Sequence, residues 1–126
     1  MKEFMALIHK QRGHLETKSP EQEQTFLQAC IDYIGKLTKG GNLIAAQPLV
    51  RDGKFVSRSK GVWKDGPYNE TKEVIAGYYH LLAKDLDEAI ELVKDNPEFV
   101  FSEQVRIEVR PIKMKEVTKD YVYPKS

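Results

Sequence analysis

The order of strand and helix patterns is the feature that most constrains the fold of this chain. Apolar runs of strand length occupy residues 3–9, 42–50, 74–83 and 105–109. One amphipathic helical segment separates the first run from the second, and another separates the third from the fourth. This order, β-α-β-β-α-β, predicts an α+β domain of the ferredoxin-like, split βαβ type, with both helices on one face of an antiparallel sheet.

Both helical segments begin with clear start signals. Ser19 is a suitable N-cap, Pro20 suits the first helical position, and Gln22 lies at the third position. Asp85 and Glu88 have the same relation at the start of the second helix. The apolar stripe of the first helix, widened by Leu27, Ile31 and Ile34, consists of Phe26, Cys30, Tyr33 and Leu37. Each helix is therefore expected to pack one face on the sheet.

The segment between the second and third strand runs predicts an inserted β-hairpin. Residues 51–54 have turn chemistry, and residues 55–63 have scattered apolar positions that suit a hairpin arm. Pro48 cannot donate to a β-ladder and indicates a sheet edge or a bulge. We expect a domain over residues 1–112 and a C-terminal extension over residues 113–126, which is either a frayed terminus or an arm laid on a partner.

Composition excludes several classes of protein. A chain of 126 residues fits one domain, and 20 basic against 19 acidic residues produce no overall field for nucleic acid or a membrane surface. No stretch resembles an export signal or a membrane span. The single cysteine, Cys30, excludes an internal disulfide and favours a reducing cytoplasm. No metal-binding motif or glycine-rich phosphate loop is present, so we predict neither a metal nor a cofactor.

Residues 65–73, DGPYNETKE, combine turn-forming residues with ionisable side chains directly before a strand run. Asp65-Gly66-Pro67 is interpreted either as a tight turn or as the source of a pocket carboxylate, Asp65, that carries a proton. Glu70 and Lys72 lie two residues apart and project to one side of an extended segment. They are either a solvated surface pair or the holders of a small anion.

Charged and aromatic side chains also gather on two of the predicted strands. His80 has a pKa near neutrality by residue type, so it is a candidate general acid or base, or else a hydrogen-bonded interface histidine. Tyr78 shares its side of the strand and is a candidate pocket residue. Arg106, Glu108 and Arg110 share one side of the last strand, where they either bind an acidic ligand or form salt bridges between subunits.

Three stretches, DGPYNETKEVIAGYY, DLDEAIELV and VRIEVRPI, together resemble the DGPF branch of the YCII-related family, with Tyr68 where that branch usually has phenylalanine. The resemblance implies a ferredoxin-like subunit that pairs through its open sheet face into a dimeric α+β barrel, with a pocket in or beside the barrel. Relatives in the wider superfamily look like small cytoplasmic enzymes acting on ring-derived acids and lactones, some with a His–Asp pair. The first helix here has no histidine, and Cys30 falls near that place.

Two hypotheses follow, and the residues leave open whether the protein is an enzyme. The first is a homodimeric pocket protein that acts by acid–base chemistry on an acidic organic small molecule, with His80 or Asp65 as the proton carrier. The genes of many DGPF proteins are thought to lie beside genes for extracytoplasmic-function sigma factors. The second hypothesis is therefore a non-catalytic ligand-sensing or protein-binding accessory of transcription control.

Overall fold

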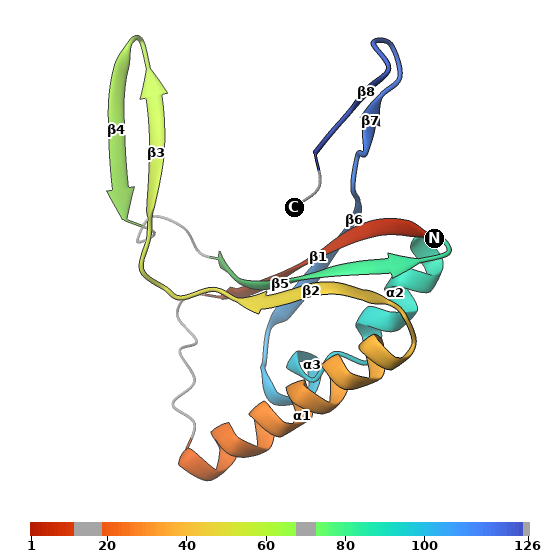
Figure 1. The fold of residues 1–126 in the computed structure, drawn as a ribbon. Helices are drawn as coiled ribbons and strands as arrows, with labels where there is room; N and C mark the ends of the chain where they lie inside the picture. Colours follow the sequence, from red (N-terminus) through yellow and green to blue (C-terminus); the bar gives the residue numbers. More distant parts are fainter. Residues whose placement is uncertain (12–18, 68–72, 125–126) are drawn as a thin grey trace.

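The computed structural model describes residues 1–11, 19–67 and 73–124 (Figure 1). The elements are β1 (Lys2–Gln11), α1 (Pro20–Lys39), β2 (Leu43–Pro48), β3 (Lys54–Ser59), β4 (Val62–Pro67), β5 (Glu73–Ala83), α2 (Leu86–Lys94), α3 (Glu98–Phe101), β6 (Val105–Pro111), β7 (Lys115–Glu116) and β8 (Tyr121–Val122).

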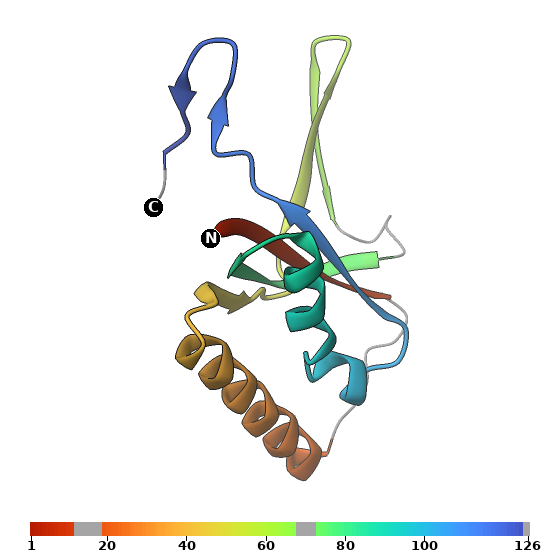
Figure 2. The ribbon, with the colours of Figure 1, turned by 90° about the vertical axis from the view of Figure 1, so that its right-hand side faces the viewer.

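The central sheet has the strand order β2-β5-β1-β6, and each neighbouring pair is antiparallel. With β3, β4 and the terminal strands set aside, this is the ferredoxin-like order that the sequence predicts. Figures 1 and 2 show α1, α2 and α3 together on one side of this sheet. The opposite side, which we call the open face, carries no helix among the described residues.

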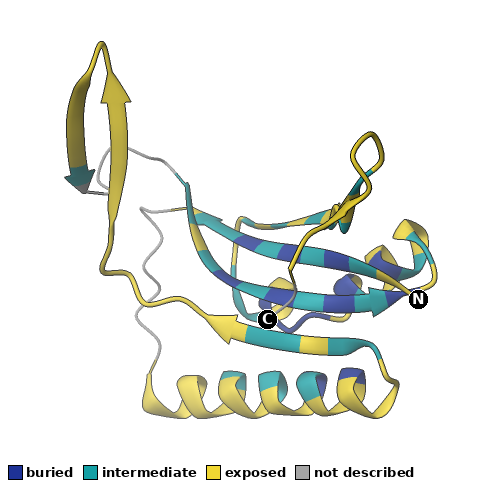
Figure 3. Cartoon of the chain, turned by 45° about the horizontal axis from the view of Figure 1, so that its top comes forward, coloured by how far each residue is buried: buried dark blue, intermediate teal, exposed yellow. Residues whose placement is uncertain are grey.

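The hydrophobic core lies between the sheet and the helices. Buried and half-buried residues alternate along β1 and β5, as Figure 3 shows, because successive strand residues point to opposite faces. The ring of Tyr33 in α1 packs edge-on against that of Tyr79 in β5, with centroids 5.5 Å apart. The Tyr33 hydroxyl also donates a hydrogen bond of 2.8 Å to the carbonyl of Leu92 in α2. The core therefore ties both long helices to the central strands.

The predicted helix caps are confirmed. Ser19 and Gln22 form a capping box at the start of α1, and the Asp85 carboxylate accepts from the backbone N–H of Glu88 at 2.9 Å. The apolar stripe of α1 is narrower than predicted, since Leu27 and Ile31 are 59% and 51% exposed. The one-turn helix α3 was not predicted from the sequence.

The inserted hairpin is present, but its turn lies elsewhere than predicted. The loop is Lys60-Gly61, whose φ angles of 50° and 78° match the two-residue turn that suits the twist of β-hairpins. Residues 51–54 instead lead from β2 into β3. The interpretation of Asp65-Gly66-Pro67 as a tight turn is wrong, because these residues belong to β4 and Asp65 pairs with Val56 across the ladder.

The C-terminal extension folds back on itself as a short hairpin of β7 and β8. Figures 1 and 2 show that this hairpin and the β3–β4 hairpin both extend from the side of the sheet opposite α1 and α2. β2 is an edge strand with Pro48 at its end, as the proline predicted. The described chain is therefore a two-layer α+β body with two hairpins rising beyond its open face.

Candidate functional site

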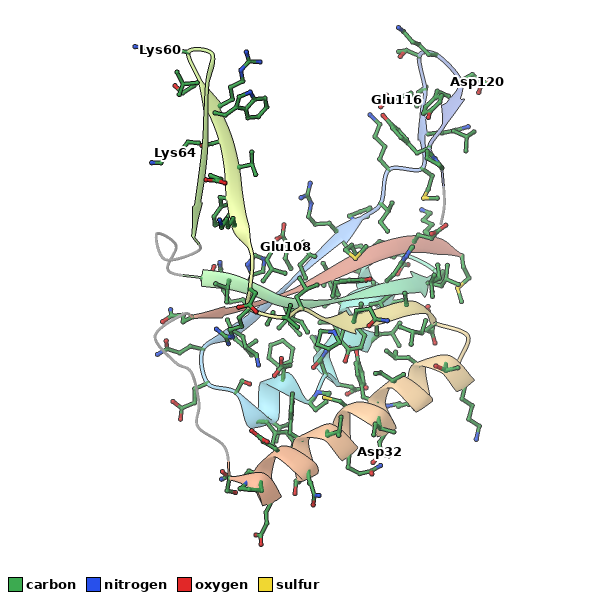
Figure 4. The ribbon with its side chains drawn as sticks, turned by 60° about the vertical axis from the view of Figure 1, so that its left-hand side comes forward. Asp32, Lys60, Lys64, Glu108, Glu116 and Asp120 are labelled. Atoms are coloured by element: carbon green, nitrogen blue, oxygen red, sulfur yellow. The ribbon has the colours of Figure 1, made fainter. Side chains whose placement is uncertain are left out.

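The strand register brings the predicted strand residues to the open face of one sheet. Met5 of β1 lies opposite both His80 of β5 and Arg110 of β6. Directly opposed residues in antiparallel strands point to the same side. The other open-face residues of β1, β5 and β6 include Glu3, Leu7, His9, Glu73, Ile75, Tyr78, Leu82, Arg106 and Glu108. Figure 4 labels Glu108 on this side of the sheet, away from α1.

His80 forms a pair with a carboxylate that the sequence did not identify. Its Nε2 atom lies 2.8 Å from Oε1 of Glu3, and the two side chains are 23% and 9% exposed. An ionised carboxylate can only accept, so Nε2 carries the hydrogen and donates it to Glu3. In the tautomer that carries its hydrogen on Nε2, Nδ1 is the proton acceptor of the ring. This arrangement orients an imidazole in the manner of a general base.

A second charged group lies toward the other end of the open face, around His9. Nε2 of His9 is 3.0 Å from Oε1 of Glu108, and its Nδ1 is 3.9 Å from Oε1 of Glu73. Arg106 binds Glu73 through two guanidinium nitrogens, with Nε 2.9 Å from Oε2. Arg110 is more loosely held, since its Nε lies 3.8 Å from Oε2 of Glu108.

The contact between Arg106 and Glu73 shifts the pKa of both groups. The hydrogen bonds from Arg106 lower the pKa of Glu73 below its usual value, and the positive charge of Arg106 adds to the effect. The same contacts raise the pKa of Arg106. Glu73 therefore stays ionised on this face at neutral pH, and much of the positive charge of Arg106 is neutralised within the chain.

The other predicted site residues are not brought to this face. Asp65 lies in β4, which forms a separate two-stranded sheet with β3. Glu70 and Lys72 fall outside the described residues. The predicted anion site between them therefore stays a prediction.

Two hollows lie on the helix side of the described chain. One of about 330 Å³ lies where α1 ends, next to Tyr33, Lys36 and Asn42. A wider depression follows the outer surface of α1 beside Leu27, Ile31 and Phe101. Neither is lined by a predicted site residue.

Ionisable groups on the helix side serve packing. Nζ of Lys10 lies 3.0 Å from Oε2 of Glu98, a buried residue whose Oε1 accepts from the Ser102 hydroxyl at 2.9 Å. These contacts hold α3 against the end of β1. Burial chiefly raises the pKa of Tyr79 to about 12, so this core tyrosine is protonated at neutral pH. Cys30 is only partly buried.

Sequence reasoning missed Glu3, His9 and Glu73 as members of the charged face. A signal for the first two was present, because Glu3, Met5, Leu7 and His9 recur every second residue in the first strand. Among the described residues, no cluster of three or more His, Cys, Asp or Glu side chains is placed to hold a metal ion.

Fold and face together define a class of protein: a ferredoxin-like α+β subunit with one helix-covered and one open, charged sheet face. A family model described as the YCII-related domain matches residues 2–113. The chain therefore belongs to the YCII-related family. A search of curated proteins found no match. Within the described part of the chain, no helix has the length and apolar character needed to cross a membrane.

Proposed function

We propose that this protein is a homodimer of the DGPF type that binds an acidic organic small molecule at its open face and acts on it by acid–base chemistry. His80 is the proton carrier, and Glu3 orients its ring. The observation that carries the proposal is the 2.8 Å contact between Nε2 of His80 and Oε1 of Glu3. Cys30, the single cysteine, supports a reducing cytoplasm as the compartment.

The environment of His80 suits proton transfer. The Glu3 carboxylate fixes the tautomer of the ring and stabilises the imidazolium that forms when Nδ1 accepts a proton. The His80 side chain keeps 23% of its surface exposed, so a ligand can approach it. Asp65 lies on the separate β3–β4 hairpin, and the proposal therefore assigns proton transfer to His80.

Cations on the same face provide recognition of an acid. The side chains of Arg106 and Arg110 are 72% and 70% exposed. Arg110 shares only a long contact of 3.8 Å with Glu108, so its guanidinium is the more available for a bidentate pair with a ligand carboxylate. Arg110 of β6 and His80 of β5 both lie opposite Met5 of β1, the strand between them, so anion binding and proton transfer would share one row across the sheet.

Pairing of two copies through the open face is supported by the pattern of side chains. Half-buried Met5, Leu7, Tyr78 and Leu82 interrupt the charged groups, and a bare sheet face with such residues favours a protein partner over water. A two-fold axis would set the alternating Arg106, Glu108 and Arg110 row of one chain against its copy, where opposite charges can meet.

Thermal denaturation with benzoate and succinate tests the binding claim, with benzamide and succinamide as uncharged control ligands. At a concentration 100 times Kd, a ligand stabilises the folded state by about 2.7 kcal/mol. For a domain of this size, the expected rise in Tm is on the order of 10 °C. We expect Arg110→Gln to lose this shift, whereas Lys94→Gln, on the outer side of α2, keeps it. Where the wild type converts a carboxylate to a product, we expect His80→Gln to bind that carboxylate without converting it.

Two outcomes would contradict the enzyme proposal. One is a carboxylate shift of equal size in the wild type and in Arg110→Gln. The other is turnover by His80→Gln at the wild-type rate. No shift with any carboxylate would instead favour the second function, an accessory tied to sigma-factor regulation. The mutual pairing of Arg106, Glu73, His9 and Glu108 supports that alternative, because charges neutralised within the chain suit a protein interface.

A further inference from the structure

The β3–β4 hairpin carries several exposed apolar side chains. All six residues of β3 are exposed. Phe55, Val56, Val62 and Trp63 are 50%, 70%, 67% and 67% exposed. A monomeric protein rarely presents so much apolar surface on one projecting element.

The hairpin has little to hold it in place on its own. Its two strands pair only with each other among the described strands, and the Arg58 guanidinium lies over the Trp63 ring at 5.2 Å. An isolated two-stranded hairpin is marginally stable in water unless it packs on another surface. A cover from outside the described chain would therefore stabilise this hairpin.

The geometry indicates where that cover lies. The β3–β4 hairpin rises at one end of the open face and the β7–β8 hairpin at the other end (Figures 1 and 2). Figure 4 shows Lys60 and Lys64 pointing away from the space above the sheet. Side chains alternate along a strand, so Val56, Arg58 and Trp63 lie on the face turned toward that space. The open face and the two hairpins thus form a trough.

We propose that a second copy of the chain fills this trough, and that the β3–β4 hairpin is an arm that packs along the side of the partner's body. This inference rests on the proposed pairing through the open face and adds the arm to it. Six strand residues span about 20 Å, whereas packed sheets lie about 10 Å apart. The arm is therefore long enough to pass the partner's sheet and reach its helix layer.

Charge supports a second copy as the occupant. Two cations, Lys54 and Arg58, and one carboxylate, Asp65, lie on the face of the arm turned toward the trough, because side chains alternate along each strand. The second helix and its caps, residues 85–95, carry the opposite sign in Asp85, Asp87, Glu88, Glu91 and Asp95 against Lys94. A basic arm that reaches an acidic helix layer gains from complementary potentials. Closure of the trough would also convert the exposed surface around His80 into a covered pocket.

Trp63 is the sole tryptophan of the chain and reports on the arm without any substitution. The wild-type protein is diluted through the range in which light scattering shows its dimer dissociating. We expect the Trp63 emission to shift to longer wavelength and acrylamide quenching to rise in step with dissociation. A matched pair of variants follows. The arm variant Val56→Ser/Trp63→Ser should weaken dimerisation at least about 100-fold, and Leu27→Ser/Ile31→Ser, on the equally exposed surface of α1, should leave it unchanged.

The outcomes separate this inference from the proposed function. A wild type that stays monomeric removes both the dimer and the arm. A stable wild-type dimer whose Trp63 remains as quenchable as in the monomer overturns the arm alone. Equal dimer affinity in the arm variant and the α1 variant has the same consequence. Protection of Trp63 only by anionic vesicles or RNA, and not by dimer formation, would also overturn a second copy as the occupant.

Discussion

Gly77→Ala tests the junction between the central sheet and the arm. Gly77 lies in β5 opposite Pro48, the last residue of β2, where the chain leaves the sheet toward the hairpin. A Cβ atom added there would lie 2.9 Å from the carbonyl oxygen of Gln47 and 3.1 Å from Cα of Pro48. Both contacts are with backbone, so the end of β2 must move to make room.

Two opposing effects determine how much Gly77→Ala changes the free energy of unfolding. Overpacking of this kind typically costs about 1–3 kcal/mol. Alanine also restricts the unfolded chain, which returns about 0.4–1 kcal/mol. We therefore expect a net loss of about 1–2 kcal/mol in the free energy of unfolding. Loss of the hydrogen bond from the Leu49 N–H to the Ala76 carbonyl, now 2.8 Å, would accompany the displacement of β2.

Urea denaturation at one fixed protein concentration measures this loss, because the stability of an oligomer depends on concentration. Gly35→Ala is the matched control. Its added Cβ meets nothing within 4 Å on the exposed side of α1, so it should stabilise by about 0.5–1 kcal/mol. A Gly77→Ala variant as stable as the wild type, or more stable, would refute the argument from the close approach of β2.

Two pH-dependent predictions follow from the perturbed groups. Burial raises the pKa of Tyr79 to about 12, so the contribution of its protonated hydroxyl to stability is complete below about pH 10 and is lost between about pH 10 and 12. The urea midpoint of Tyr79→Phe should therefore fall less than that of the wild type over this interval. An equal fall of the two midpoints would contradict this prediction. Hydrogen bonds from Arg106 lower the pKa of Glu73 from 4.5, so the stability that it contributes is complete above about pH 4.5 and is lost as the pH falls through the lower folded value. The stability of Glu73→Gln should therefore fall less than that of the wild type as the pH is lowered through this range. An equal loss of stability in the two proteins would contradict the pairing of Glu73 with Arg106.

Local sequence patterns were sufficient to predict the helix starts and the order of helices and strands. Ser19 and Asp85 accept hydrogen bonds from the backbone of the first turn of each helix, and such caps depend only on neighbouring residues. The β-α-β order limited the topology to few arrangements. The hairpin turn was harder, because residues 51–54 have ordinary turn chemistry, while Lys60-Gly61 depends on a lysine that adopts a positive φ of 50°.

The site depends on register, which the sequence does not specify. His80 and Glu3 are 77 residues apart, and they meet because Glu3 pairs with Leu82 and Met5 pairs with His80. A register shift of one residue would send Glu3 to the helix side. The same holds for His9, which reaches Glu73 just beyond the irregularity after Ile8. Side-chain alternation thus predicted that His80 shares a side with Tyr78 and that Arg106, Glu108 and Arg110 share a side, and only the paired sheet identified their partners.

The mass of the native protein in solution tests the central claim, that two copies meet through the open face. Light scattering at micromolar concentration should give the mass of two 14.5 kDa chains for the wild type. Leu7→Glu, which places a charge on β1 between Tyr78 and Glu108, should give the mass of one folded chain. A wild-type mass of one chain would contradict the account, as would a Leu7→Glu protein that remains as fully dimeric as the wild type.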